Sequence, residues 1–162
     1  MTVLLRRAIF LTFVLALLAG FGCGKKTVDD STPSDELALT AQEQQVAQQI
    51  SGGIVYFEYD RYDLKSESKA VLTQKAAIIK QYPQLRVTIE GHCDELGTEE
   101  YNLALGERRA RAAYEFLVGL GVPPGQLEMI SYGKLHPAVE GHSEAAWAKN
   151  RRDEFRVFKP RR

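Results

Sequence analysis

The stretch LRVTIEGHCDELGTEEYNLALGERRARAAYEFL, residues 85–117, joins the pattern of a strand to the pattern of a helix. Apolar and polar side chains alternate over residues 85–91, which predicts a strand with one buried face. Thr98 stands where a helix N-cap is expected, with two glutamates after it, and Gly119 or Gly121 is placed to end that helix. A strand with one apolar face does not suit a doubly wound parallel sheet, whose strands are buried on both faces.

The rest of the chain repeats this alternation of strands and helices. Further strands are expected at residues 54–59, 127–132 and 153–158, and further helices from Ser66 to a stop before Pro83 and over residues 143–150. We therefore expect an α/β fold: a two-layer sandwich with a mixed four-stranded sheet and helices on one face, in the order strand, helix, strand, helix, strand, short helix, strand. The small side chains that would let the second helix lie close to the sheet are Gly106, Ala110 and Ala113.

The length and charge of the chain limit its function. Its 162 residues include 21 basic and 21 acidic side chains and carry no formal net charge. This length allows one domain with a core and appendages, but not two large domains. A balanced charge provides no field that would recruit nucleic acid or an anionic membrane surface. Binding is therefore expected to depend on a local group of side chains.

The first 22 residues have the pattern of an export signal. Arg6 and Arg7 precede an uncharged run from Ala8 to Gly22, which corresponds to the positive and apolar regions of a signal peptide. The run is shorter than the roughly 20 residues that a membrane-spanning helix needs. We expect residues 1–22 to be a signal peptide and the protein to leave the cytoplasm.

Cys23 follows this signal and resembles the lipid-accepting cysteine of bacterial lipoproteins; ordinary signal cleavage nearby is the alternative. Acylation would anchor the chain to a membrane, and Gly24 is similar to the residue found in lipoproteins of the outer membrane. The polar composition predicts a flexible tether, which together with the lipidated N-terminus that the resemblance implies would cover residues 23–53. Residues 35–50 are expected to form at most a weakly held helix. The folded domain is expected to cover residues 54–162.

Asp94 and Arg109 are the candidate binding residues. Asp94 follows the predicted strand and lies beside the N-terminus of the next helix. Arg109 has no acidic residue three or four positions away, whereas Arg111 has a glutamate at both i−4 and i+4. An arginine without a helical partner either points into water or meets a carboxylate from elsewhere. A carboxylate and a guanidinium together would recognise a zwitterionic amino-acid end; a structural salt bridge between Asp94 and Arg109 is the alternative.

Two chemical alternatives involve the neighbouring His92 and Cys93. They could form a nucleophilic pair with Asp94 as the orienting group, but adjacent residues at a strand end point to opposite sides. The same three residues could hold a metal ion with His136 or His142, but no CxxC or HxxxH spacing supports this. The sequence therefore favours binding over catalysis, and we expect neither a metal nor a cofactor.

The segment GHCDELGTEEYNLALGERRA, residues 91–110, resembles the peptidoglycan-binding signature of the OmpA-like family. The segments IVYFEYDRYDL, residues 54–64, and SYGKLHPAVEGHSEAAWAKNRRDEF, residues 131–155, are similar to the lipoprotein members of this family. The similarity covers about residues 54–158. We expect neither a flagellar-stator nor a porin-type member of the family. The first needs a membrane-spanning helix and the second a membrane-spanning barrel.

The resemblance implies a noncovalent link between the outer membrane and the cell wall, without catalysis. Asp94 and Arg109 match the aspartate and the arginine that hold the diaminopimelate of the peptidoglycan stem peptide in this family. Other matching positions would line or shape the groove, and His92 would support it structurally. These further positions are Tyr59, Asp60, Thr98, Tyr101, Asn102 and Leu105. The family also implies a lipid-anchored protein whose domain lies in the periplasm and binds the periplasmic protein TolB.

Two positions depart from the family pattern. Cys93 replaces a threonine or alanine, and Leu96 replaces an arginine that is common in the lipoprotein members. Neither substitution touches the central pair. A protein-interaction module and a peptidoglycan hydrolase are the rival classes, and a hydrolase would need a positioned acid, nucleophile or metal.

Overall fold

The computed structural model describes residues 36–161. The expected signal peptide at residues 1–22, the lipid-accepting Cys23 and the tether up to residue 35 lie outside the described residues. The helical elements are α1 (Ala41–Ser51), α2 (Ser66–Ile79), α3 (Glu99–Gly119), the short 3₁₀ helix η1 (Pro124–Gln126) and α4 (Glu144–Asn150). The strands are β1 (Val55–Tyr56), β2 (Arg86–His92), β3 (Leu127–Gly133) and β4 (Arg152–Phe158).

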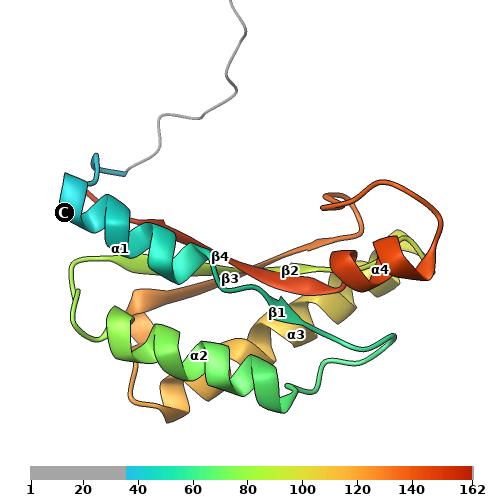
Figure 1. Ribbon diagram of the computed structural model, residues 1–162, viewed down its shortest axis with the longest axis horizontal. Helices are drawn as coiled ribbons and strands as arrows, with labels where there is room; N and C mark the ends of the chain where they lie inside the picture. The colour runs from blue at the N-terminus through green and yellow to red at the C-terminus, as the bar shows by residue number, and fades with distance from the viewer. Residues whose placement is uncertain (1–35, 162) are drawn as a thin grey trace, which may run out of the picture. The chain divides into compact units, whose positions relative to one another are not determined.

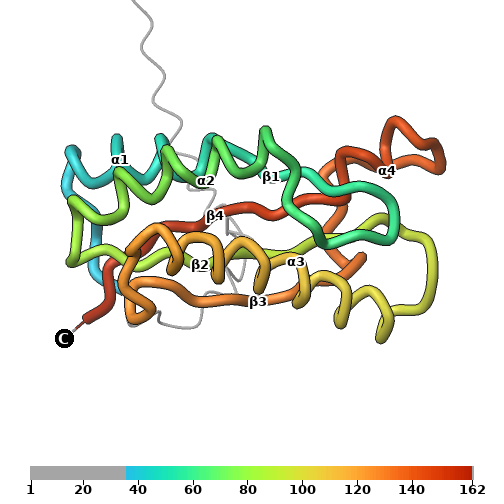
Figure 2. Tube along the Cα trace, turned by 90° about the horizontal axis from the view of Figure 1, so that it is seen from below, coloured from blue at the N-terminus to red at the C-terminus, as the bar shows by residue number. Residues whose placement is uncertain are grey.

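The four strands form one mixed sheet in the order β1-β4-β2-β3. β4 is antiparallel to both of its neighbours, β1 and β2, whereas β2 and β3 run parallel. Figure 1 shows α2 and α3 beneath the sheet, and Figure 2, seen from below, shows α3 along β2 and β3. This arrangement confirms the two-layer α/β sandwich with a mixed four-stranded sheet that the sequence predicts.

Close contact between α3 and β2 requires glycine. A Cβ atom on Gly91 would lie 2.1 Å from the carbonyl oxygen of Gly106, and a Cβ atom on Gly106 would lie 2.3 Å from the hydroxyl oxygen of Ser131. Ala110 and Ala113, on the next turns of α3, are fully buried. The prediction that small residues bring this helix close to the sheet is therefore confirmed.

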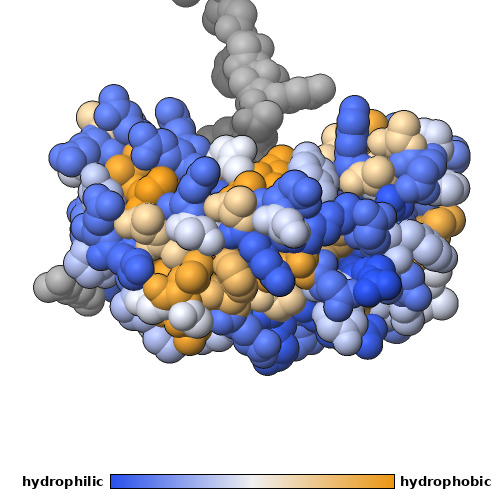
Figure 3. Space-filling view, turned by 60° about the horizontal axis from the view of Figure 1, so that its bottom comes forward, coloured by the Kyte–Doolittle hydropathy of each residue, from blue (hydrophilic) through white to orange (hydrophobic). Residues whose placement is uncertain are grey.

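The hydrophobic core lies between the sheet and the layer of α2 and α3. Buried members of this core include Leu72, Val87, Ile89, Leu117 and Phe155. Each side chain of this kind contributes roughly 1.5–3 kcal/mol when it is buried. The outer surface of the helical layer is mostly hydrophilic, with hydrophobic residues in separate patches (Figure 3). Among the described helices, none has the length and apolar character needed to cross a bilayer.

The first strand is shorter than the expected range of residues 54–59. β1 contains only Val55 and Tyr56, which pair with the first two residues of β4. The chain then turns at Asp60, whose φ of 54° is a left-handed conformation that few residues other than glycine adopt. β1 therefore covers only one end of β4, and α1 lies beside the rest of that strand (Figure 2).

α1 packs on the domain. Thr40 and Glu43 form a capping box at its N-terminus. Val46 and Ile50, which are 6% and 0% exposed, belong to the hydrophobic core. The expectation of a flexible tether that reaches residue 53 is therefore wrong for residues 36–53.

Polar contacts from distant parts of the chain also hold α1. The carboxylate of Glu43 accepts hydrogen bonds from Lys159 at 2.9 Å and from Gln84 at 3.1 Å. These bonds, after the larger effect of the Thr40 backbone N–H, lower the pKa of Glu43 to about 2. Lys159 and Gln84 are 116 and 41 residues away in the sequence. The local composition of α1 therefore could not reveal that this segment is held.

We expect Ile50→Ala to lower the free energy of unfolding by about 2–4 kcal/mol, because the change leaves a cavity at a fully buried position. Gln49→Ala, at an exposed position of the same helix, should change this free energy by less than about 0.5 kcal/mol. Urea unfolding followed by circular dichroism measures both values. Equally small effects of the two substitutions would show that α1 does not unfold with the domain.

Candidate functional site

A small groove lies where β2 ends and α3 begins. Its volume is about 180 Å³, and its lining residues are Tyr59, Asp60, Asp94, Leu96, Gly97, Tyr101, Asn102 and Leu105. They come from the turn after β1, the loop after β2 and the first turns of α3. The structure therefore brings together all of the residues predicted to bind peptidoglycan except Thr98 and Arg109.

The loop after β2 is fixed by the start of α3. Thr98 is the N-cap of this helix, and its hydroxyl accepts a hydrogen bond of 3.2 Å from the backbone N–H of Tyr101. The side-chain amide of Asn102 donates to the carbonyls of Leu96, at 2.8 Å, and Thr98, at 3.0 Å. Gly97 has a φ of 90°, which favours glycine. Thr98 thus shapes the groove without lining it.

Two tyrosines form an exposed rim. Tyr59 is 59% exposed and Tyr101 is 45% exposed. The hydroxyl of Tyr101 donates a hydrogen bond to the carboxylate of Asp60, and this bond raises the pKa of Tyr101. The rim therefore presents aromatic faces with polar tips, a combination that suits a ligand with both apolar and polar parts.

Asp94 is almost completely buried, at 5% exposed, and its partner is not Arg109. One carboxylate oxygen accepts the backbone N–H of Leu96 at 3.2 Å, and the other lies 3.2 Å from Nη1 of Arg151. Arg151 also pairs with Glu144. The alternative of a structural salt bridge between Asp94 and Arg109 is therefore wrong, and the sequence analysis missed Arg151.

Arg109 lies below the groove, with its side chain fully buried. Its guanidinium donates to the backbone carbonyls of Arg61 and His92, both at 2.9 Å, and of Glu58, at 3.2 Å. Burial lowers the pKa of Arg109. Its centre lies 5.1 Å from the centroid of the Phe57 ring. Arg109 thus ties the turn after β1 to the end of β2.

Asp153 is another buried ionisable residue that the sequence analysis missed. It is 0% exposed, and its carboxylate oxygens have no hydrogen-bond partner within residues 36–161. Burial raises the pKa of Asp153 well above its usual range, although the positive charge of Arg109 opposes this effect. The feature of the sequence that could have identified Asp153 is the run NRRD, residues 150–153, which places charged residues at the start of a strand.

His92 and Cys93 do not form a nucleophilic pair. The Cys93 thiol donates to the carbonyl of Asn102 at 3.4 Å, whereas the His92 ring stacks on Tyr132 with centroids 5.3 Å apart. Burial raises the pKa of Cys93 to about 11. Burial and, secondarily, Arg152 lower the pKa of His92 to about 4. Both shifts oppose the thiolate–imidazolium pair that nucleophilic catalysis needs.

The metal site considered with His136 or His142 is not formed either. Nδ1 of His142 lies 2.8 Å from the carboxylate of Glu95, and this exposed pair raises the pKa of His142. The ring of His136 packs edge-on against Tyr132 at 4.7 Å. Within the described residues, Cys93 belongs to no group that could hold a metal ion.

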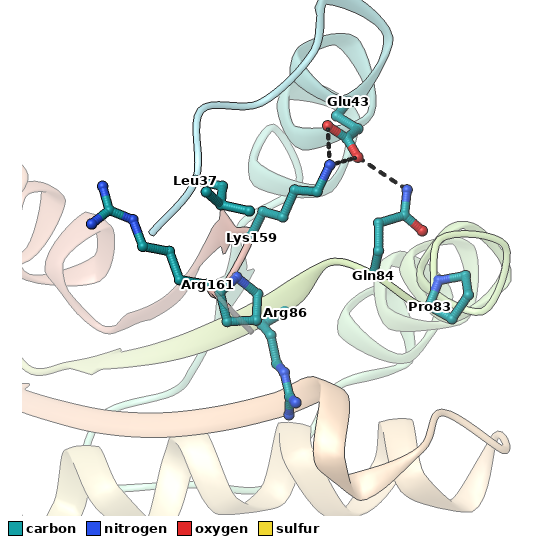
Figure 4. A pocket seen from close by; sticks show the side chains of 8 residues that line it. Leu37, Glu43, Pro83, Gln84, Arg86, Lys159 and Arg161 are labelled. Carbon is teal, nitrogen blue, oxygen red and sulfur yellow. Dashed lines mark hydrogen bonds and ion pairs between the residues drawn. The ribbon is translucent and has the colours of Figure 1, made fainter. Parts of the chain in front are cut away.

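A larger hollow of about 840 Å³ lies near the start of β2, at the opposite end of this strand from the groove. It is lined by Leu37, Glu43, Pro83, Gln84, Arg86, Lys159, Pro160 and Arg161. Figure 4 shows that Lys159 and Gln84 point toward Glu43, whereas Arg86 and Arg161 point in different directions. The buried carboxylate of Glu43 therefore already has hydrogen-bond partners within the protein. No sequence-predicted site residue lines this hollow, so the groove is the candidate site.

Comparisons with known proteins place this geometry in context. The chain matches the OmpA family over residues 56–151. It is 49% identical over 138 residues to the peptidoglycan-associated lipoprotein of Pseudomonas aeruginosa, which covers 85% of this chain and 75% of that protein. Identity to the peptidoglycan-associated lipoprotein of Pasteurella multocida is 41% over 138 residues, or 85% of this chain and 88% of that protein. The crystal structure of the peptidoglycan-associated lipoprotein from Burkholderia pseudomallei is similar, with a TM-score of 0.63, 45% identity, and coverage of 64% of this chain and 88% of that chain.

We expect the Cys93 thiol of the folded protein to react with iodoacetamide at pH 8 at least about 100-fold more slowly than in 8 M urea, because the thiol is buried and has a raised pKa. The measurement uses a full-length Cys23→Ser chain, in which Cys93 is the only cysteine. Mass spectrometry of timed samples gives both rates. Similar rates in buffer and in urea would contradict the buried position of Cys93.

Proposed function

The chain belongs to the OmpA family, and we propose that its domain binds peptidoglycan noncovalently through the groove at the end of β2. The observation that carries this proposal is the buried Asp94 carboxylate in the wall of a groove with an exposed aromatic rim. The relatives, which are peptidoglycan-associated lipoproteins, support the same ligand class. The match to the OmpA family also confirms the resemblance seen in the sequence.

The proposed ligand group is the diaminopimelate residue of a stem peptide. The groove, at about 180 Å³, is smaller than the roughly 300–1,000 Å³ of ordinary small-molecule pockets. It therefore suits the end of one residue better than a pair of sugar rings. The free end of diaminopimelate carries an amino group and a carboxylate. We assign the amino group to Asp94, with Asp60 as a second carboxylate at the rim.

Arg109 is assigned to the ligand carboxylate from below the groove. A guanidinium has five N–H donors, and three backbone carbonyls accept bonds from Arg109. A fourth donor contacts Sγ of Cys93 at 3.4 Å, and these groups are buried in the free protein. A ligand reaches them only when the turn that carries Glu58 and Arg61 moves outward. The proposal therefore includes a shift of this turn on binding.

The other candidate residues have supporting roles in this proposal. Tyr59 and Tyr101 contact the ligand at the rim, and Leu105 provides an apolar wall. Asn102 and Thr98 hold the loop after β2. No reacting group is required in this mechanism, because the ligand is held by ion pairs, hydrogen bonds and packing.

The cellular role proposed for the chain is that of an outer-membrane lipoprotein. Acylated Cys23 anchors the chain, and the domain in the periplasm holds the cell wall as part of the Tol-Pal system, which serves envelope integrity and cell division. Many weak contacts between two extended surfaces then add avidity. The exposed rim, including Leu96 at 36% exposed, also supports a protein-interaction function in which a TolB-like partner covers the groove.

We expect a diaminopimelate-containing stem peptide to bind the full-length chain in detergent, and we expect Asp94→Asn and Arg109→Gln each to weaken this binding at least about 10-fold. The first change removes the charge that pairs with the ligand amino group, and the second removes the guanidinium and its carbonyl contacts. Isothermal titration calorimetry gives the dissociation constants. A peptide with lysine in place of diaminopimelate should bind more weakly, because it lacks the second carboxylate.

Glu107→Gln is the matched control, because Glu107 is an exposed residue of α3 that does not line the groove. Circular dichroism and thermal unfolding establish that each variant is folded. The proposal fails if the wild type does not bind, or if folded Asp94→Asn and Arg109→Gln chains bind like Glu107→Gln. Mass spectrometry of the recovered peptide tests the hydrolase alternative, since cleavage by the wild type would support that class.

A further inference from the structure

A second polar cluster lies on the face of the sheet turned away from α2 and α3. Glu90 and His92 are two residues apart in β2 and therefore point to the same face. Glu154 of β4 is directly opposite Glu90 in the antiparallel pair. One possible ligand atom from each of these three residues lies within 4.8 Å of the others. None of the three lines the groove.

The imidazole of His92 has no partner in this cluster. The side chain is 3% exposed, and neither ring nitrogen makes a hydrogen bond of normal geometry within residues 36–161. The backbone of His136 is close enough to raise the pKa of His92, but burial is the larger effect and lowers this pKa to about 4. A neutral imidazole has one nitrogen with a lone pair that can bind a metal ion.

Two carboxylates face each other beside this imidazole. Burial raises the pKa of Glu90, and the negative charge of Glu154 adds to this effect, whereas Arg156 opposes it. A divalent cation between Glu90 and Glu154 would offset their repulsion and supply the missing partner of His92. The three side chains thus offer one nitrogen and two carboxylates to a single point.

Two arginines contact this cluster, and each has other acceptors. Nε of Arg152 donates to Glu154, and Nε of Arg156 lies 3.4 Å from Glu90. Arg152 also donates to two backbone carbonyls. Arg156 also pairs with Glu36 at 2.8 Å. A cation can therefore bind the carboxylates of Glu90 and Glu154, because Arg152 and Arg156 keep their other acceptors.

Solvent reaches the cluster from one side. A hollow of about 390 Å³ lies beside it, lined by Ser51, Ile54, Glu90, Glu154, Phe155 and Arg156. Glu154 is the more accessible ligand, since its side chain is 39% exposed, against 14% for Glu90. A metal ion thus has an entry path, and water can complete its coordination.

We propose that Glu90, His92 and Glu154 bind a divalent transition-metal cation. Imidazole with carboxylates is a ligand set for ions such as Zn²⁺, whereas Mg²⁺ and Ca²⁺ prefer oxygen alone. Zinc binds nitrogen and carboxylate oxygen at roughly 2.0–2.2 Å, so the ligand atoms of one ion lie within about 4.4 Å of one another. Rotation of a glutamate side chain can bring any oxygen that is farther away to this separation.

The test is a titration of metal-free, full-length Cys23→Ser chain in detergent with Zn²⁺, followed by calorimetry. The Cys23→Ser change removes a second thiol that could bind zinc. We expect one equivalent of Zn²⁺ to bind, and Mg²⁺ at the same concentration not to bind. Co²⁺, used as a second probe, should give visible absorption bands without the strong near-ultraviolet band of a thiolate ligand.

Substitutions in the cluster separate this site from other metal-binding groups. Glu154→Gln and His92→Gln should each weaken Zn²⁺ binding at least about 10-fold. Glu128→Gln, an exposed carboxylate of β3, and His142→Gln should leave it unchanged. Arg156→Gln should strengthen binding about 3- to 10-fold, because it removes the cation that competes for Glu90. Circular dichroism establishes that each variant is folded, because an unfolded chain would expose Cys93 and His92 to zinc.

Each outcome decides the proposal. Stoichiometric binding that is weakened by Glu154→Gln and strengthened by Arg156→Gln supports a site at these residues. The proposal is overturned if the wild type binds no Zn²⁺. It is also overturned if folded Glu154→Gln binds like the wild type, or if His142→Gln removes the binding. The groove and its ligand do not enter this test.

Discussion

The buried guanidinium of Arg109 is the interaction on which the groove depends. A charge removed from water is tolerated only when it is paired or hydrogen-bonded, and Arg109 meets this requirement with backbone carbonyls. Two of these belong to the turn after β1 and one to the end of β2. One side chain therefore determines the distance between two walls of the groove. It reaches both because glycines let α3 lie directly on β2.

The sequence predicted those features that depend on neighbouring residues. Alternation over residues 85–91 identified β2, and the hydroxyl of Thr98 identified the start of α3. Resemblance to the OmpA-like family identified most of the groove lining. For Arg109, the sequence allowed either water or a carboxylate as its partner. The structure shows a third solution, because backbone carbonyls leave no mark in the sequence.

Contacts between segments that are distant in the chain could not be predicted from local sequence patterns. Asp94 pairs with Arg151, which is 57 residues away, and α1 is held by Lys159, which is 116 residues from Glu43. Such pairs depend on the order of strands in the sheet, which local patterns do not determine. The cluster on the opposite face of the sheet is a similar case. Alternation places two of its members on one face, but the third arrives only through the register of β2 with β4.

The two ends of β2 have different neighbours, and this has a mechanical consequence. The start of α1 and the end of β4 lie near one end, and the groove lies at the other. If the N-terminal side is pulled while a ligand is held in the groove, the tension runs along the strands. The hydrogen bonds between β2 and β4 lie across that direction and are loaded together in shear. α1 lies between the pulled end and β1 in the chain, so its contacts through Glu43, Val46 and Ile50 resist the same pull before it reaches the groove.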